Sequence, residues 1–264
     1  MDILEILESV EQGKITSKTA KKMLSLYSIE EIGTIAKIDI NRRKRRGIPE
    51  VIFAENKEVE DIKKIIKTIM KKEDLLVISR IKKKDYQKIL SFAKIAKIGI
   101  KTGEKSSTVL LFKKPIKAHG GKVGIVTAGT SDIGIAEEAR LMCEAMNCKC
   151  IISYDVGVAG MQRIFPVIKE MIEQEVDCII AVAGMEAALA TLVASLVDIP
   201  IIGLPTSVGY GYGEKGIGAL ASMLQSCALG LSVVNIDNGI GAGAMAANIV
   251  NRSIQKSRTH SKKR

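Results

Sequence analysis

The sequence predicts an α/β protein, in which a doubly wound, three-layer parallel sheet follows a smaller mixed α+β N-terminal domain. Apolar residues make up 47% of the 264 residues, aromatic residues only 3%, and tryptophan is absent. This composition favours close packing of helices on a sheet over a β-sandwich. Between residues 122 and 253, strand-like and helix-like apolar runs alternate five times, which is typical of consecutive βα units.

The N-terminal half has a less regular pattern. Apolar spacing predicts helices over 3–10, 17–26, 59–70 and 86–96, an extended segment over 35–40, and strands over 50–53, 75–78 and 108–112. Residues 113–121 contain Pro115 and two glycines and show no apolar period. We therefore expect an N-terminal domain over 1–116, a linker over 117–121, the α/β domain over 122–253 and a disordered basic tail over 254–264.

The C-terminal half carries the five βα units. Strands are predicted over 123–127, 150–153, 178–183, 199–203 and 231–235, and helices over 135–146, 164–175, 187–196, 219–229 and 242–253. In doubly wound sheets, ligands bind where the parallel strands end at their carboxyl side. The loops that follow these strands are therefore the expected place for a functional site.

Charge and cysteine content limit the class of protein. The net charge is +11, yet residues 123–250 hold five basic and thirteen acidic residues, so the positive excess lies at the two ends. Solvated basic surfaces explain these ends better than nucleic-acid binding, because stacking aromatic residues are scarce. Five cysteines in apolar settings indicate reduced thiols and a cytoplasmic protein, and core packing is favoured over a metal cluster for Cys143, Cys148 and Cys150.

Neither a membrane span nor a signal peptide is expected. The apolar stretch over 178–204 is interrupted by Glu186, Asp198 and Pro200, and two strands around a helix explain it better than a transmembrane helix. Residues 1–8 carry three acidic side chains where a signal peptide would have a basic segment followed by an apolar core.

The loops after the predicted strands contain small and polar residues that could hold a phosphorylated ligand. They present backbone N–H groups and hydroxyls ahead of helices, which suits phosphate or ribose, although simple helix capping by Ser131 or Asp132 remains an open alternative. The sequence matches neither a Walker A loop nor GxGxxG. The candidate binding residues are Gly129, Thr130, Ser131, Asp132, Asp155, Gly157, Gly184, Met185, Pro205, Thr206, Ser207, Gly209, Tyr210, Gly211, Asn238 and Gly239.

Candidates for acid–base and nucleophilic chemistry are few. Only two histidines exist, His119 and His260, and neither lies within the α/β domain, so a Ser-His-Asp arrangement there is excluded. Glu186 is either a helix-dipole partner or a general base at a strand end. From the pattern alone, Cys227 on an apolar helix favours a buried structural role over a nucleophile.

Taken together, these loops resemble the LarB family of pyridinium-3,5-biscarboxylic acid mononucleotide synthases of nickel-pincer cofactor biosynthesis, and more distantly the PurE-like phosphoribosylaminoimidazole carboxylases. The resemblance covers nearly the whole chain apart from the tail. It rests on the runs VTAGTSD (126–132), DVGVAG (155–160), AGME (183–186), LPTSVGYG (204–211), LQSC (224–227), NIDNG (235–239), KID (37–39) with Arg42, and GIPEVIF (47–53).

The resemblance implies a PurE-like, flavodoxin-like sheet and a carboxylase/hydrolase. It implies carboxylation of nicotinic acid adenine dinucleotide at ring position C5 with carbon dioxide or bicarbonate, and release of AMP. By resemblance, Cys227 is the catalytic thiolate and Glu186 removes the C5 proton. Mg²⁺ is expected with ligands unassigned, no organic cofactor is expected, and a homo-octamer is implied. We also expect Arg42 and Arg45 to supply positive charge near a neighbouring subunit's phosphate or adenylate site.

Two alternative functions stay open. One is an aminoimidazole ribonucleotide carboxylase or mutase, which the family likeness would expect to use a histidine near the second loop. This chain has Gln162-Arg163 where the LarB family usually has His-Arg, which puts a proton-transfer role at that position in doubt. The other is a nucleotide-binding or nucleic-acid-binding module without chemistry, suggested by the basic ends.

Overall fold

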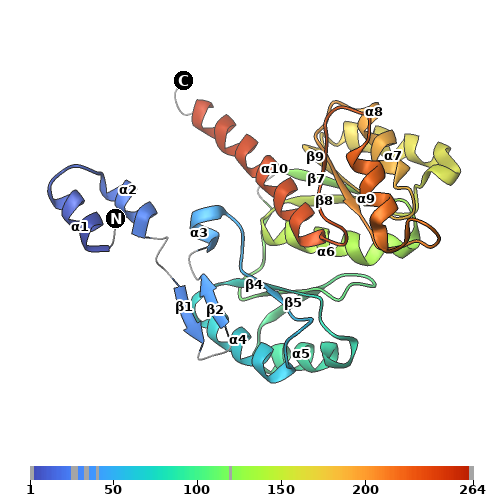
Figure 1. Ribbon diagram of the computed structural model, residues 1–264. Coiled ribbons are helices and arrows are strands. Elements are labelled where there is room, and N and C mark those ends of the chain that lie inside the picture. Colours follow the sequence, from blue (N-terminus) through green and yellow to red (C-terminus); the bar gives the residue numbers. More distant parts are fainter. Residues whose placement is uncertain (1–2, 25–28, 33–35, 40–41, 119–120, 262–264) are drawn as a thin grey trace.

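The computed structural model describes residues 3–24, 29–32, 36–39, 42–118 and 121–261 of the chain. The C-terminal half forms one sheet of five parallel strands: β7 (Lys122–Thr127), β8 (Lys149–Ser153), β9 (Cys178–Ala183), β10 (Ile201–Pro205) and β11 (Leu231–Val233). Their spatial order is β11-β10-β9-β7-β8 (Figure 1). The chain places β8 on one side of β7 and then returns to place β9, β10 and β11 on the other side, so the strand order reverses between β7 and β9. The predicted doubly wound parallel sheet is confirmed.

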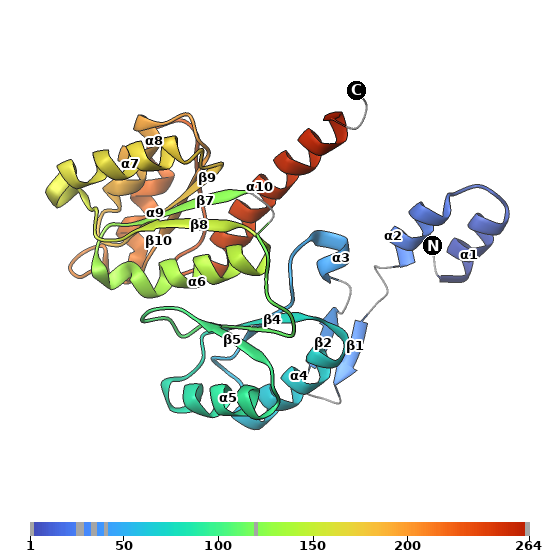
Figure 2. The same ribbon diagram turned by 180° about the vertical axis from the view of Figure 1, so that it is seen from behind.

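Helices cover both faces of this sheet (Figure 2). On one face lie α6 (Ile133–Ala145) and α10 (Gly239–Ser261), and on the other α7 (Ile164–Glu173), α8 (Ala188–Leu196) and α9 (Ile217–Leu224). Side chains of β7 alternate between the two cores, with Ile125 towards α6 and Val126 towards the opposite helices. This period of two follows from the strand geometry and makes a three-layer domain.

The N-terminal domain is built on a second, mixed sheet. Its order is β3 (Val51–Phe53), β4 (Leu75–Ser79), β6 (Val109–Phe112) and β5 (Gly99–Thr102), with β3 and β4 parallel and the other pairs antiparallel. Helices α4 (Val59–Lys72) and α5 (Lys83–Ile95) pack on one face. Strand β5 was not predicted, because its sequence Gly-Ile-Lys-Thr is half exposed and lacks an apolar run.

Four shorter elements and an arginine-rich helix precede this sheet. They are α1 (Ile3–Glu11), α2 (Ser17–Leu24), the antiparallel pair β1 (Ile29–Ile32) and β2 (Ala36–Asp39), and α3 (Arg42–Arg46). Both initial helices agree with the sequence pattern. Helix α3 forms where apolar spacing predicts no element, and its hydrogen-bonded end is marked by Gly47, whose φ of 72° is left-handed.

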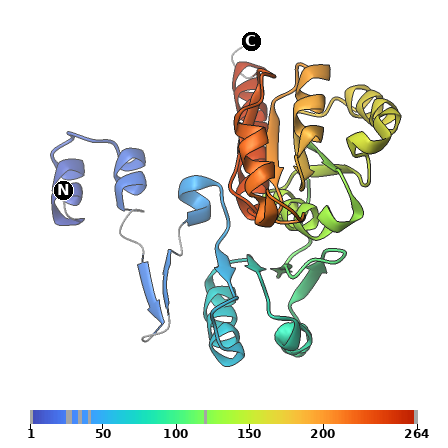
Figure 3. The same ribbon diagram turned by 45° about the vertical axis from the view of Figure 1, so that its right-hand side comes forward.

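Helix α6 lies between the two sheets and is buried all round. The free face of the N-terminal sheet, with Leu75, Val77 and Leu110, shares one apolar core with α6 and with the C-terminal sheet. Figures 1 and 3 show the N-terminal sheet and its helices stacked against the α6 side of the five-stranded sheet. A helix that contacts protein on every side has no solvent face to keep polar, which explains why it contains so few exposed positions.

Small residues let α10 approach α6 closely. A Cβ atom on Gly243 would collide with the carbonyl oxygen of Ala139, and one on Gly239 would lie 2.7 Å from the carbonyl oxygen of Ile135. The thiol of Cys143 donates to the carbonyl oxygen of Gly243 at 3.4 Å. The helix pair therefore requires glycine at these two positions because backbone meets backbone.

Glu138, buried in the middle of this stack, joins three elements. Its Oε2 accepts hydrogen bonds from Ser79 Oγ, at the end of β4, at 2.6 Å and from Thr108 Oγ1, just before β6, at 2.8 Å. Its Oε1 accepts from the backbone N–H of Ile240, in the first turn of α10, at 3.1 Å. One carboxylate thus joins both domains and the last helix. Both of its buried oxygens accept hydrogen bonds, as buried polar atoms usually do.

The next residue, Glu137, makes a second link between the domains. It binds Arg140 through two hydrogen bonds of 2.7 and 2.6 Å, accepts from the Tyr154 hydroxyl, and accepts from the Glu104 backbone N–H at 2.9 Å. Burial alone would raise the pKa of Glu137, but the hydrogen bonds from Arg140 and Tyr154 hold it below its ordinary value.

The ends of the chain complete the comparison with expectation. Helix α10 continues to Ser261, whereas the sequence pattern predicted a helix ending at 253 and a disordered tail from 254. Residues 262–264 of that predicted tail, and His119 of the predicted linker, lie outside the described residues. No helix within the described residues is long and apolar enough to cross a membrane.

Replacing Glu138 by Ala is expected to lower the free energy of unfolding by about 3 kcal/mol or more, because it leaves buried donors without an acceptor. Glu138→Gln retains one acceptor oxygen and should lose less. Urea denaturation measures both, with exposed Glu170→Ala as the control, expected to stay within about 0.5 kcal/mol of wild type. An unchanged midpoint for Glu138→Ala would contradict the role of this carboxylate.

Candidate functional site

The carboxyl edge of the sheet brings three predicted loops together around Asp132. Its Oδ2 accepts from the Gly129 backbone N–H at 2.9 Å, and its Oδ1 accepts from Thr206 Oγ1 at 2.6 Å. The Gly184 backbone also hydrogen-bonds to this carboxyl. Asp132 is buried and therefore holds together the loops after β7, β9 and β10, next to the point where the strand order reverses.

Asp132 titrates above the ordinary range of an aspartate. Burial raises its pKa, the hydrogen bonds from Thr206, Gly129 and Gly184 oppose this rise, and the nearby charge of Asp237 adds to it. Ser131, exposed beside it, is the middle residue of the short turn Thr130–Asp132 ahead of α6. The loop over 129–132 is thus a fixed turn in which Asp132 is internal and Thr130 and Ser131 face outward.

The turn after β9 carries Glu186 in a strained conformation. Met185 and Ala187, its two neighbours, have left-handed φ values of 50° and 52°. Gly184 has no room for a side chain, because a Cβ atom there would collide with the carbonyl oxygen of Val208. Glu186 precedes the Ala187 cap and so lies outside the first turn of α8, contrary to the helix-start position expected from the sequence. Strain of this kind often marks functional positions.

The loop after β10 is the most exposed part of this edge. Tyr210 and Tyr212 lie fully in solvent, and Gly209 and Gly211 have φ values of 155° and 78°. Pro205 ends β10, and the Ser207 backbone N–H donates to Asp237 Oδ1 at 2.8 Å. This hydrogen bond joins the loop to the one after β11.

Asn238 and Gly239, in that last loop, have structural contacts. Asn238 Oδ1 accepts from the Gly241 N–H at 2.8 Å, as an N-cap does. Gly239 is the close-contact residue against α6 described above. Both were predicted to bind substrate, and nothing in their contacts requires a ligand.

The second loop is ordered by an ion pair. Asp155 has a left-handed φ of 58°, and its Oδ2 lies 2.9 Å from Arg163 Nη1. Gly157 lies against the Ala128 carbonyl oxygen, where a Cβ atom would come within 2.6 Å. Gln162, the residue that replaces the expected histidine, is exposed in the short helix Val158–Arg163.

Cys227 differs from the other four cysteines. Cys143, Cys148, Cys150 and Cys178 lie close enough to interact in the core, where burial raises the pKa of Cys148 and Cys178 to about 12 and a hydrogen bond with Cys150 and burial raise that of Cys143. Cys227 is exposed. Among the described cysteines, Cys227 is therefore the one whose thiol a substrate in solution can reach most easily.

The expected position of Cys227 on an apolar helix was wrong. Helix α9 ends at Leu224, because Ser226 Oγ accepts from the Ala228 N–H at 3.2 Å and turns the chain. The same oxygen accepts from Thr191 Oγ1 on α8 at 2.8 Å. Thr191 lies on α8, and the turn that carries Glu186 precedes this helix, so the hydrogen bond places the segment before Cys227 against the helix that follows Glu186.

The arginines of α3 lie far from these loops within one chain. Arg42 Nε lies 3.3 Å from Glu50 Oε2, and Arg43 Nη2 donates to Asn147 Oδ1 at 3.4 Å, beyond the end of α6. Asn147 follows the end of α6 and Ser131 precedes its start, and the 13 residues of this helix separate the two by about 20 Å. The Arg45 side chain lies outside the described part of the structure.

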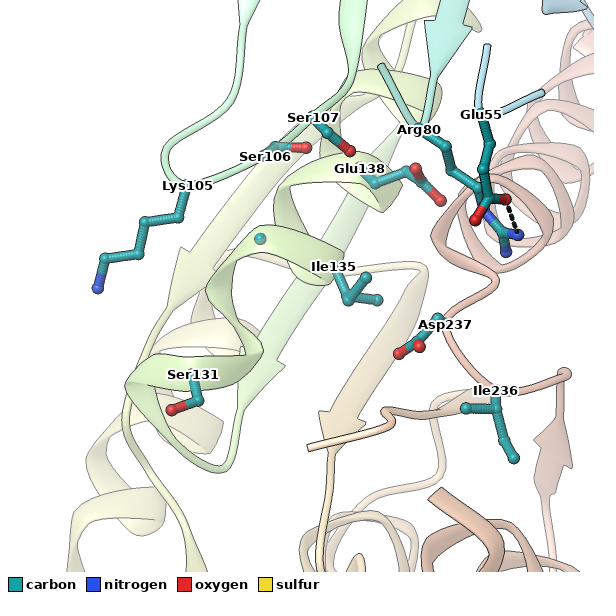
Figure 4. Close-up of a pocket in the computed structure, with 11 residues that line it drawn as sticks. Glu55, Arg80, Lys105, Ser106, Ser107, Ser131, Ile135, Glu138, Ile236 and Asp237 are labelled. Carbon is teal, nitrogen blue, oxygen red and sulfur yellow. Dashed lines mark hydrogen bonds and ion pairs between the residues drawn. The ribbon is translucent and has the colours of Figure 1, made fainter. Parts of the chain in front are cut away.

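A pocket that the sequence did not reveal lies between the two domains, beside the loop over 129–132. It has a volume of about 580 Å³, and Arg80, Lys105, Ser106 and Ser107 of the N-terminal domain line it together with Ser131 and Asp237 (Figure 4). Arg80 follows the carboxyl end of β4 with a left-handed φ of 56°. The available signal in the sequence was its position two residues after the strand predicted over 75–78.

No group of three or more His, Cys, Asp or Glu side chains in the described ranges could hold a metal ion. The described residues therefore offer the expected Mg²⁺ no cluster of this kind.

Two protein-family models match this chain, one in each half. The AIR carboxylase family model matches residues 122–263, which is more than half of the chain. The chain belongs to the AIR carboxylase family. A LarB/PurE-like N-terminal domain model matches residues 29–110. This family consists of carboxylases and mutases, so the coarse expectation of an enzyme of this type is confirmed.

Individual members of the AIR carboxylase family are also similar. An uncharacterized protein of Methanocaldococcus jannaschii is 42% identical over 93% of this chain and 95% of its own length. The N5-carboxyaminoimidazole ribonucleotide mutase of Thermotoga maritima is 29% identical over 49% of this chain and 74% of its length. The mutase of the same name from M. jannaschii is 30% identical over 48% and 76%.

The difference among cysteines can be tested by brief treatment of the native protein with N-ethylmaleimide, followed by peptide mass spectrometry. Cys227 is expected to react, while Cys143, Cys148 and Cys178 stay unmodified because their thiols are buried and protonated. Unfolded protein, in which all five should react, is the control. Modification of the core thiols at the rate of Cys227 would contradict this arrangement.

Proposed function

We propose that this protein carboxylates the pyridinium ring of nicotinic acid adenine dinucleotide at C5 and hydrolyses the phosphoanhydride, giving pyridinium-3,5-biscarboxylic acid mononucleotide and AMP. This is the first step of nickel-pincer cofactor synthesis. The observation that carries the proposal is the exposed Cys227 beside α8, whose preceding turn presents Glu186. The LarB/PurE-like N-terminal match supports it further.

The chemistry needs a nucleophile and a base. A pyridinium ring is electron-poor, so C5 attacks carbon dioxide only after a nucleophile has added to the ring and made it an enamine. A thiolate suits this step because it adds and leaves readily, and we propose Cys227 for it. Glu186 then accepts the C5 proton, the C–S bond breaks, and the ring becomes aromatic again with its new carboxylate.

The remaining loops have binding roles in this proposal. Thr130 and Ser131 face outward from the turn that Asp132 fixes, and with the backbone of residues 184–185 and 206–211 they hold the ribose and phosphates. The overall balance takes up one carbon dioxide and one water and releases AMP. Any Mg²⁺ would be bound mainly by the substrate phosphates, as is common for this ion.

A mutase or carboxylase acting on an aminoimidazole ribonucleotide is the second candidate, because two relatives with that name match the α/β half. Two features favour the first proposal. Residues 122–253, which contain all the strand-end loops of the α/β half, hold no histidine, and the chain carries the additional N-terminal domain.

Mass spectrometry of the products from nicotinic acid adenine dinucleotide and ¹³C-bicarbonate tests the proposal, with and without Mg²⁺. Wild type should give a labelled mononucleotide and AMP, Cys227→Ala should give neither, and Glu186→Gln should be slower by about 10²–10⁴-fold. Glu214→Gln, in a nearby exposed loop, is the control. Turnover of N5-carboxyaminoimidazole ribonucleotide without labelling of the dinucleotide would favour the second candidate.

We also propose that the α/β domain assembles into a homo-octamer. Large apolar side chains are exposed on and after α9: Ile217 (62%), Leu224 (65%) and Leu229 (93%). More lie on and before α7, including Phe165 and Ile172. Such surfaces usually meet a partner, and cyclic or dihedral copies of one chain are the commonest solution.

Sedimentation velocity should give a species of eight times 28.5 kDa. Ile217→Asp is expected to yield smaller species, because it puts a charge in the apolar contact, while Ile95→Asp in the N-terminal domain, at a still more exposed isoleucine, should not. A monomeric wild type at about 10 μM would refute the assembly.

A further inference from the structure

We infer that the pocket between the two domains binds the phosphate group of a nucleotide, and that the N-terminal domain thereby forms part of the substrate site. The identity of the nucleotide as the AMP half of the dinucleotide rests on the proposed function. The binding of a nucleotide phosphate by Arg80 and Lys105 is independent of the proposed function.

The pocket gathers hydrogen-bond donors from both domains. Arg80 follows β4, while Lys105, Ser106 and Ser107 belong to the turn between β5 and β6. Ser131 enters from the loop after β7. Figure 4 shows Lys105 and Ser131 at one end of the pocket and Arg80 at the other, with Glu138 between. Two cations and several hydroxyls around one cavity suit a phosphate, which accepts several hydrogen bonds and carries charge.

The acidic residues in the lining are already engaged with donors. Glu138 accepts from Ser79, Thr108 and the Ile240 N–H. Asp237 accepts from the Ser207 N–H, and Glu55 Oε2 lies 3.4 Å from Arg80 Nη1 in an exposed pair. Lys105 has no ion-pair partner among the residues that the structure describes, so its charge is available to a ligand.

The donors are presented by a rigid turn, because the turn over 103–107 is fixed to α6. The Glu104 N–H donates to Glu137, and the Lys105 carbonyl lies so close to Gly134 that a Cβ atom there would come within 2.6 Å. The Ser107 carbonyl accepts from the Ile81 N–H at 3.0 Å, which links the turn to the segment after Arg80. Fixed donors lose little entropy on binding and give a built site.

The position of the pocket suits one end of a long substrate. The pocket lies at the start of α6, on one face of the five-stranded sheet, whereas Cys227 and Glu186 belong to the α8–α9 side. The loop over 129–132 stands at the sheet edge between them. A dinucleotide whose ring lies near Cys227 would therefore extend its second phosphate and nucleoside towards the N-terminal domain.

Isothermal titration of AMP into the full chain tests the inference. Arg80→Gln and Lys105→Gln should each raise Kd about tenfold, since each removes a charge-assisted hydrogen bond to phosphate. Lys97→Gln is the matched control, because Lys97 is also exposed and left-handed, with φ 55° against 53° for Lys105. Glu55→Gln should lower Kd about threefold, because it removes the competing anion beside Arg80.

The outcomes separate this inference from the proposed function. AMP binding that depends on Arg80 and Lys105 upholds the pocket even if the dinucleotide is not carboxylated. Absent AMP binding, or equal affinity in both variants and wild type, overturns it even if carboxylation succeeds. The same titrations with nicotinic acid mononucleotide and with inorganic phosphate identify the source of the phosphate, and dependence on the two residues for either of these but not for AMP would refute the AMP assignment.

Discussion

The carboxylate of Glu138 is the interaction on which the arrangement of the two domains depends. It lies inside a helix between two sheets, and its oxygens are used by Ser79, Thr108 and the Ile240 N–H. A charged group in such a place is tolerated only when every donor meets an acceptor. The same helix begins directly after the loop that Asp132 fixes, so the position of α6 sets the position of the candidate site relative to the N-terminal domain.

Much of the fold follows from apolar periodicity. The inner strands β9 and β10 are almost continuous apolar runs because both sheet faces are covered, and such runs are easy to recognise. Element ends were less predictable. Helix α9 stops at Leu224 because the Ser226 hydroxyl bonds to a neighbouring backbone N–H and to Thr191, and this tertiary contact leaves no trace in apolar spacing.

The candidate site was predictable where it depends on strand ends and not where it depends on domain packing. Asp132, Gly184 and Thr206 follow parallel strands, and the structure brings them together as the fold class requires. Arg80 and Lys105 belong to another sheet, and only the packing of α6 brings them to Ser131. Asn238 caps α10 and Gly239 fits it against α6, and these contacts leave the substrate-binding role predicted for both residues a prediction.

The shared core around α6 has a consequence for how this protein can change over evolutionary time. In a loosely linked two-domain protein, each half can be lost or exchanged separately. Here Leu75, Val77 and Leu110 of one half and Val123 and Ile125 of the other enclose the same helix. Loss of the N-terminal domain would leave an apolar helix and a buried carboxylate facing water, so in this chain such a loss would require new polar residues on the uncovered face of α6.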